Sequence, residues 1–374
     1  MAEGIVFFAG PPLAAPGNRQ GDGMMAEILG LGVTHSPAML GTDDRLAGIF
    51  EHLLKHKNLP AIARDPNSWP QAMRHEWVEY QAGRAAPANR LRTVEGLRAV
   101  RSALDAFNPD FVLIWGDDQY ENFREEGVAP FCIFALDTIS STPFKRVGAA
   151  NAWAESGDTV FHHQGHRAGG RHLATALTAE GFDISYAYEM RHEAGLPHAF
   201  INALLLLDYD RRGLPWPVVP FHVNCHGSSA ISKRGAFGQI DSDGSEVPDP
   251  PGPSPARCFA LGAATARALK QSPWRVAVVA SSSWSHSFLV EKNHYLYPDL
   301  ESDRARFHEM RDGQFSRWEC LTTAQLEDAG QQELLNWVCL AGAMTELGRR
   351  PVWTDLVETY VFGAPKASAV FEVG

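Results

Sequence analysis

The sequence predicts an α/β fold, in which a single large domain is built on a mostly parallel central sheet with helices on both faces. Three observations favour this fold. Short apolar runs alternate along the chain with segments of helical periodicity, and polar clusters follow several of the apolar runs. A hydrophobic content of 45% over 374 residues is also enough to bury a large core. We therefore expect the chemistry at the ends of the strands, where open α/β folds place their ligands.

The elements follow from the spacing of the apolar residues. Strands are expected where a short apolar run rich in Val, Ile and Phe stops at a turn signal, at residues 28–33, 111–115, 131–135, 184–187, 218–223 and 276–281. Helices are expected where apolar residues recur every three to four positions, at residues 45–56, 69–81, 94–107, 200–207, 258–269 and 331–344. The helix at 331–344 is expected to be the last element of the fold.

Two segments fall outside this alternation. Residues 1–25 are rich in Gly, Pro and Ala, so they predict a flexible leader before a catalytic domain at 26–374. Residues 57–93 are long and polar for a simple crossover and predict a helical insertion near the site. Such an insertion can serve as a lid or a subunit contact, and a plain surface excursion is the alternative.

Composition narrows the class of partner. The formal net charge of −11, without a long basic run, disfavours nucleic acid and anionic membrane surfaces. No apolar stretch approaches the roughly 20 residues that cross a bilayer, which predicts a cytoplasmic protein. The five cysteines form no C-x-x-C pair, which argues against a disulfide framework and a thiolate zinc site. The expected partner is a small molecule.

A histidine ends the first apolar run. His35 lies in Thr34-His35-Ser36-Pro37, and Pro37 stops the strand from extending. The side chain therefore sits at the rim of the sheet, where it is a candidate metal ligand. A capping residue without chemistry is the alternative.

Three further clusters carry polar groups where a strand ends or a helix begins. The turn at 117–123 is rich in Asp and Asn, which also cap turns. His198 opens an apolar helix, a position that lowers proton affinity and suits a neutral base, although a contact without chemistry is the alternative. His286 lies in the serine-rich segment 281–287, where small side chains admit a substrate, unless the segment is a surface turn.

A carboxylate marks the helix at 331–344. Glu333 lies at the edge of the apolar stripe that contains Leu334 and Trp337, so it faces inward. Burial of an unpartnered carboxylate costs several kcal/mol, so Glu333 needs a cation or an arginine beside it.

Considered jointly, these clusters resemble the class III extradiol ring-cleavage dioxygenases, the superfamily of the protocatechuate 4,5-dioxygenase β subunit. The resemblance covers residues 28–349. The Thr-His-Ser-Pro turn looks like the family's first iron ligand, and the segment around Glu333 looks like its carboxylate ligand helix. His198 and His286 look like the two second-sphere histidines. The resemblance thus implies that His35 and Glu333 bind iron and that His198 and His286 are catalytic.

One position departs from the family pattern. The family's second iron ligand is the histidine of an Asn-Asp-His turn, and the matching residue here is Gln119. The resemblance therefore implies His35, Gln119 and Glu333 as the metal ligands. Because an amide oxygen binds Fe(II) more weakly than imidazole, Glu121 and His226 stay open as alternatives to Gln119.

What the resemblance implies is a non-haem Fe(II)-dependent dioxygenase that uses O2 to cleave the ring of a catecholic or related hydroxylated aromatic. A metal-free binding or scaffolding protein on the same fold and a zinc hydrolase are the alternatives. Assembly into a homo-oligomer stays open, as do the substrate and the bond that is cleaved.

Overall fold

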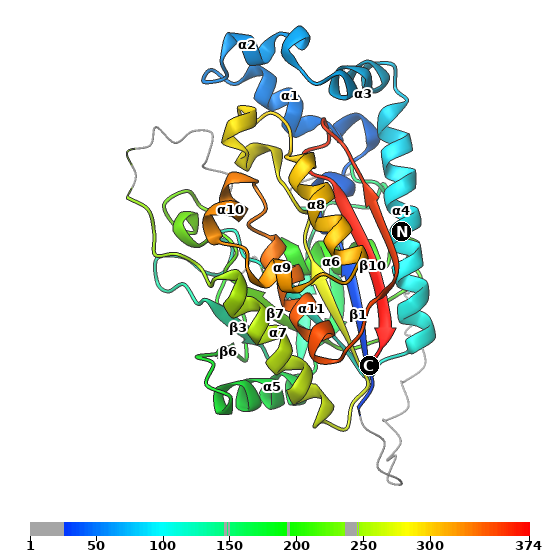
Figure 1. Ribbon diagram of the computed structural model, residues 1–374. Helices are drawn as coiled ribbons and strands as arrows, with labels where there is room; N and C mark the ends of the chain where they lie inside the picture. The colour runs from blue at the N-terminus through cyan, green and yellow to red at the C-terminus, as the bar shows by residue number, and fades with distance from the viewer. Residues whose placement is uncertain (1–25, 146–147, 149, 193–194, 236–244, 246) are drawn as a thin grey trace, which may run out of the picture.

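The computed structural model confirms the expected fold class (Figure 1). It describes residues 26–145, 148, 150–192, 195–235, 245 and 247–374, so the leader expected at 1–25 lies outside the described residues. Within this part of the chain, eight strands form one sheet in the order β6-β3-β7-β2-β8-β1-β10-β9. The inner strands β7, β2, β8 and β1 run parallel to one another.

The strands lie close to their expected positions where the sheet is buried on both faces. Because both faces of an inner parallel strand are covered, its sequence is a continuous apolar run that is easily recognised. The sheet contains β1 (Ile28–Val33), β2 (Phe111–Gly116), β3 (Phe131–Phe134), β6 (Ser185–Ala187), β7 (Val218–Val223), β8 (Val276–Ser281), β9 (Pro351–Val357) and β10 (Lys366–Val373). A separate antiparallel pair is formed by β4 (Thr138–Ser141) and β5 (Phe161–Gln164).

Helices cover both faces of the sheet. They are α1 (Gly48–Lys55), α2 (Ala61–Arg64), α3 (Gln71–Gln81), α4 (Ala85–Phe107), α5 (Arg167–Ala179), α6 (His198–Leu207), α7 (Pro255–Lys270), α8 (Leu300–Arg311), α9 (Ser316–Glu319), α10 (Thr323–Asp328) and α11 (Leu334–Glu346). Helices α5, α7 and α11 pack into the core on one face, and α1, α4 and α6 pack into the core on the other. None of the described helices has the length and hydropathy of a membrane-spanning segment.

The expectation that the helix at 331–344 ends the fold is wrong. Two strands follow α11, and β10 lies between β1 and β9, antiparallel to both. The first part of β10 is buried, but it is built from Lys, Ala and Ser rather than from large apolar residues, so it lacks the usual signal of a buried strand. Helix α11 itself begins at Leu334, which leaves Glu333 in the turn before it.

The segment at 57–93 is helical, as expected. It holds α2, α3 and the first part of α4, which begins well before the expected residue 94. In Figure 1 helices α1, α2 and α3 lie together beyond one end of the sheet. A lid or subunit role for this segment stays a prediction.

Two glycines of β1 let α11 approach the sheet. A Cβ atom on Gly32 would lie 2.1 Å from the ring of Trp337, and one on Gly30 would lie 2.4 Å from Sδ of Met344. Separations this short are impossible for real atoms. A side chain on Gly32 would push the ring of Trp337 away from the strand, whereas the flexible side chain of Met344 could move aside from a Cβ on Gly30. The contact therefore sets α11, and the carboxylate that precedes it, directly against the strand that leads to His35.

Candidate metal centre and catalytic cavity

Four parallel strands deliver the functional side chains to one edge of the sheet. His35 follows β1, Asp117 follows β2, His226 follows β7 and His286 follows β8. The carboxyl ends of parallel strands meet at the same edge, which is where open α/β folds bind ligands. The side chain of Glu333 reaches this edge from the turn before α11.

His35 and Glu333 form the centre of the site. Nδ1 of His35 lies 3.0 Å from the carbonyl oxygen of Ser281, a group that can only accept a hydrogen bond, so in the neutral ring Nδ1 holds the proton. Nε2 is then an acceptor, and it lies 3.2 Å from Oε2 of Glu333. Both side chains are at most 1% exposed. Nε2 and a carboxylate oxygen face each other at this distance only when a proton or a metal cation lies between them.

Three more polar side chains surround the same carboxylate. Nε2 of Gln119 donates to Oε1 of Glu333 at 2.9 Å, and it lies 3.4 Å from Oδ2 of Asp117. Nε2 of His226 lies 3.4 Å from Oδ2 of Asp117 and 3.7 Å from Oε1 of Glu333. Ligand atoms of His35, Asp117 and Glu333 all lie within 4.8 Å of one another. This is the spacing of a set that can close on one ion.

The site contains several buried polar atoms that lack a hydrogen-bond partner among the described residues. They are Oε1 of Gln119, Oε2 of Glu333 and both ring nitrogens of His226. Buried polar groups are normally satisfied, so a cluster of unsatisfied atoms at one point calls for a missing species. A metal cation fits, because the orphaned atoms lie beside two carboxylates that have no Lys or Arg partner among the described ion pairs.

The pKa shifts of Glu333 and Asp117 are also consistent with a metal cation at this site. Burial favours the neutral acid, but His286 and His35 hold the pKa of Glu333 well below its ordinary value. Burial and Glu333 raise the pKa of Asp117, while its contact with His226 outweighs them, so the net shift is downward. Burial lowers the pKa of His226, and the two carboxylates raise it to about 9. Two ionised carboxylates are thus held together inside the protein.

The two catalytic candidates differ in their partners. Nδ1 of His286 donates to the carbonyl oxygen of Trp284 at 2.9 Å, which leaves Nε2 as an acceptor 3.5 Å from Oε1 of Glu333. Burial lowers the pKa of His286. His198 instead places Nδ1 at 3.0 Å from a carboxylate oxygen of Glu121.

The expectation that His198 stays neutral is wrong. Burial and the helix N-terminus both disfavour the charged ring, but the Glu121 carboxylate raises the pKa of His198 to about 9. The full charge of the carboxylate, in direct contact with the ring at 3.0 Å, outweighs the partial charge at the helix N-terminus. Glu121 also accepts a hydrogen bond from the backbone N–H of His198, so it is fully engaged with this histidine.

All five of the expected site residues line one cavity of about 490 Å³: His35, Gln119, His198, His286 and Glu333. The other walls include the apolar side chains of Ile49, Phe288 and Phe362. The volume falls within the usual range of small-molecule sites. Asp117 and His226 do not line the cavity and lie behind the polar wall.

Asp117 was missed as a functional residue, and His226 was only a reserve candidate. Asp117 is fully buried, although an Asp at the start of a turn normally reads as a cap. Its place directly after a buried strand was the available signal.

Three histidines close together in the sequence, His162, His163 and His166, lie outside the site. Only His162 is exposed. His166 stacks on Phe111 and caps α5.

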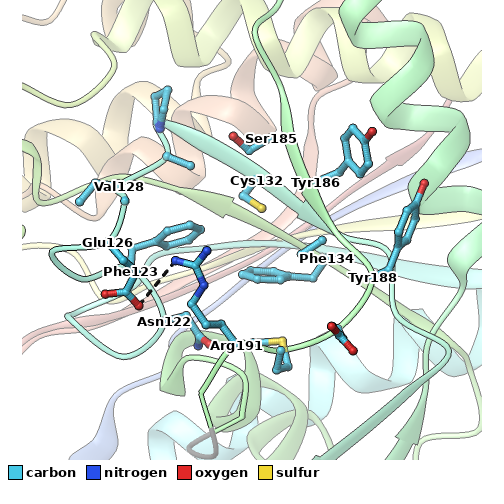
Figure 2. Close-up of a pocket in the computed structure, with 16 residues that line it drawn as sticks. Asn122, Phe123, Glu126, Val128, Cys132, Phe134, Ser185, Tyr186, Tyr188 and Arg191 are labelled. Carbon is cyan, nitrogen blue, oxygen red and sulfur yellow. Dashed lines mark ion pairs between the residues drawn. The ribbon is translucent and has the colours of Figure 1, made fainter.

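A second, larger cavity of about 710 Å³ lies beside β3 and β6, away from these residues (Figure 2). Two of its charged side chains pair with each other, since Arg191 lies 3.6 Å from Glu126. The lining includes Tyr186 and Tyr188, which are exposed. No group of ligand atoms converges there among the described residues, so the smaller cavity is the better candidate for chemistry.

Comparison with known proteins finds similarity to aromatic ring-opening dioxygenases. Residues 247–372 match the family described as the catalytic LigB subunit of aromatic ring-opening dioxygenase. The chain is 26% identical over 192 residues to a 2,3-dihydroxyphenylpropionate/2,3-dihydroxicinnamic acid 1,2-dioxygenase of Comamonas testosteroni, covering 51% of this chain and 48% of that protein. It is 25% identical over 186 residues to a gallate dioxygenase of Pseudomonas putida, covering 48% of this chain and 46% of that protein. The chain thus spans about half the length of the curated relatives it matches.

Proposed function

We propose that this chain, which is similar to proteins named as aromatic ring-opening and extradiol-type dioxygenases, is a metal-dependent dioxygenase of the class III extradiol ring-cleavage superfamily. The proposed ion is Fe(II), and the proposed substrates are O2 and a catecholic or related hydroxylated aromatic. The family implies a metal cofactor, and the described residues contain a His, Asp and Glu group that can hold one.

One observation carries the proposal. Nε2 of His35 and Oε2 of Glu333 face each other at 3.2 Å in a buried site that opens into a cavity with two more histidines. A bound Fe(II) with open coordination positions would bring the diol and O2 together and allow electrons to pass between them. His35 and Glu333 are the proposed ligands, and the turn after β2 brings Asp117 and Gln119 to the same carboxylate.

The protein's own task is to orient the ring and to move protons. Phe288, Phe362 and Ile49 provide apolar walls that exclude water and hold the ring. Nε2 of His286 is an acceptor, so we propose that it takes the proton of a substrate hydroxyl. His198, backed by Glu121, is the proposed proton donor on the other side.

Metal analysis of protein purified without oxygen tests the proposal. About one iron per chain, together with oxygen uptake on a panel of catechols and gallate-like and aminophenol-like compounds, is the expected result. Zinc with hydrolytic activity would instead favour a hydrolase. Protein that binds no metal after anaerobic reconstitution with Fe(II) would contradict the proposal and favour a binding protein.

A further inference from the structure

We propose that Asp117, rather than Gln119, supplies the third protein ligand, so that the centre holds its ion with one histidine and two carboxylates. This inference rests on the proposed function, because it assigns a ligand to the metal proposed there. It departs from the histidine ligand that the family places in this turn.

The chemistry of the two side chains separates them. The carboxylate of Asp117 is fully buried, at 0% exposed. Its polar neighbours are Asn336, Gln119 and His226, each at 3.4 Å, so none makes a short hydrogen bond to it. Because none of these contacts is a short hydrogen bond, the carboxylate oxygens of Asp117 keep lone pairs that can bind a cation.

The amide nitrogen of Gln119 is already committed to the two carboxylates, which leaves its uncharged oxygen, Oε1, as the one atom of this side chain that could bind an ion. Its Nε2 donates to Oε1 of Glu333 at 2.9 Å and faces Asp117 on the other side. Two carboxylates next to one amide fix its orientation, because the amide oxygen in that place would face a second acceptor. Gln119 therefore holds the two carboxylates together, which is the work of an outer-sphere partner.

The spacing also suits Asp117. Ligand atoms on opposite sides of an ion, each at about 2.1 Å, lie about 4.2 Å apart. The ligand atoms of His35, Asp117 and Glu333 lie within 4.8 Å of one another, so a small closure brings all three onto one ion. His226 stands behind both carboxylates, where it can orient them.

Such a centre has a distinct character. Two carboxylates balance the charge of a divalent ion, whereas a set of two histidines and one carboxylate leaves a net positive charge. Oxygen-rich sets suit Mn(II) as well as Fe(II). We therefore expect the metal-free protein to take up Mn(II), which gives a measurement of binding that does not depend on turnover.

Titration of the metal-free full-length protein with MnCl2, followed by the EPR signal of free Mn(II), tests the assignment. Wild type should bind one Mn(II). Asp117→Asn should weaken binding more than about 100-fold, because it removes a charged ligand at constant shape. Gln119→Ala should weaken binding less, within the roughly 10- to 100-fold range of an outer-sphere partner. Glu125→Gln is the matched control, since it removes an exposed carboxylate close by in the sequence, and it should bind as wild type does.

A rescue experiment separates loss of a ligand from loss of structure. The variant Asp117→Glu keeps a carboxylate at this position, and it should bind Mn(II) more tightly than Asp117→Asn, to within about tenfold of wild type. Binding in Asp117→Asn equal to wild type, a loss in Gln119→Ala as large as in His35→Ala, or a loss in Asp117→Glu as large as in Asp117→Asn would each overturn the assignment. Failure of wild type to bind either Mn(II) or Fe(II) would instead contradict the proposed function itself.

Discussion

Glu121 determines what His198 can do. The carboxylate of Glu121 accepts from both the ring and the backbone N–H of His198, and it raises the pKa of the ring to about 9. His286 has only a carbonyl oxygen as the partner of its Nδ1, and burial lowers its pKa. Two histidines in one cavity are thus driven to opposite protonation states, a pattern typical of an acid and a base.

The first prediction concerns these two histidines. Replacement of either His198 or His286 by Phe should lower turnover roughly 10²- to 10⁴-fold, the usual contribution of a general acid or base. The metal should remain, because neither side chain is a proposed ligand. Oxygen uptake and iron content measured on the same samples check this, with His75→Phe, on the exposed side of α3, as the control. Loss of iron in either site variant would identify that histidine as a ligand.

The second prediction concerns the proposed ligands. His35→Ala and Glu333→Ala should each abolish iron binding, because each removes one of the two acceptors that face each other at 3.2 Å. Metal content after anaerobic reconstitution is the measurement, and far-ultraviolet circular dichroism verifies that each variant is folded. Full iron occupancy in either variant would remove that residue from the site.

The sequence predicted the centre of the site better than its surroundings. His35, Gln119, His198, His286 and Glu333 all line one cavity, because each follows a strand or begins a helix at the same edge of the sheet. The role of Asp117, in the turn after β2, could not be predicted in the same way. Whether a buried Asp caps a turn or faces an ion depends on partners from β7 and α11, which are distant in the sequence.

At the scale of elements, the packing of α7 against α11 supports the site. A Cβ atom on Gly342 would lie 2.0 Å from the carbonyl oxygen of Phe259, and one on Gly262 would lie 1.8 Å from that of Cys339. The two helices therefore touch backbone to backbone. Since Glu333 directly precedes α11, this contact helps to fix where the carboxylate lies.

The third prediction tests that contact. Gly342→Ala should lower the free energy of unfolding by about 1–3 kcal/mol or more, because the added methyl group forces the helices apart. Gly48→Ala is the matched control, since this helical glycine has no atom within 4 Å of an added Cβ, and it should be close to neutral. Urea unfolding followed by circular dichroism measures both. Equal stability of the two variants would contradict the close packing of α7 and α11.

Elements were predictable where their burial follows a simple pattern. Strands β1, β7 and β8 were located correctly because continuous burial makes them continuously apolar. Helix α8 and strand β10 were missed for opposite reasons. Helix α8 is strongly polar, with few buried positions, whereas β10 is buried but begins with Lys366 and small residues.

At the scale of the whole molecule, a buried lysine connects helix α3 with the cavity that His35 and Glu333 line. Lys366, at the start of β10, is 1% exposed, and its Nζ donates to the carbonyl oxygen of Phe362, which lines the cavity. Glu76 of α3 accepts from the hydroxyl of Thr359 and from the backbone N–H of Tyr360. The segment at 57–93 is thereby tied to the loop that forms one wall of the cavity.

The fourth prediction follows from the charge of this lysine. Burial lowers the pKa of Lys366 to about 7, although Glu76 opposes the shift and Arg90 adds to it. Between pH 7 and the ordinary pKa of 10.5, the unfolded chain holds a proton on Lys366 that the folded chain has lost. The free energy of unfolding contributed by this group therefore rises with pH across that window, by at most about 1.4 kcal/mol per pH unit.

Lys366→Met should remove this rise, because methionine fills a similar volume without a titrating group. Urea unfolding of wild type and variant at pH 7, 8, 9 and 10 provides the test, and Lys57→Met, at an exposed position, controls for loss of a lysine as such. The free energy of unfolding of wild type should rise relative to that of Lys366→Met at each step from pH 7 to pH 10. A constant difference over the whole range would show that Lys366 keeps its proton when folded, and that charged Lys366 is stabilised in the core by Glu76.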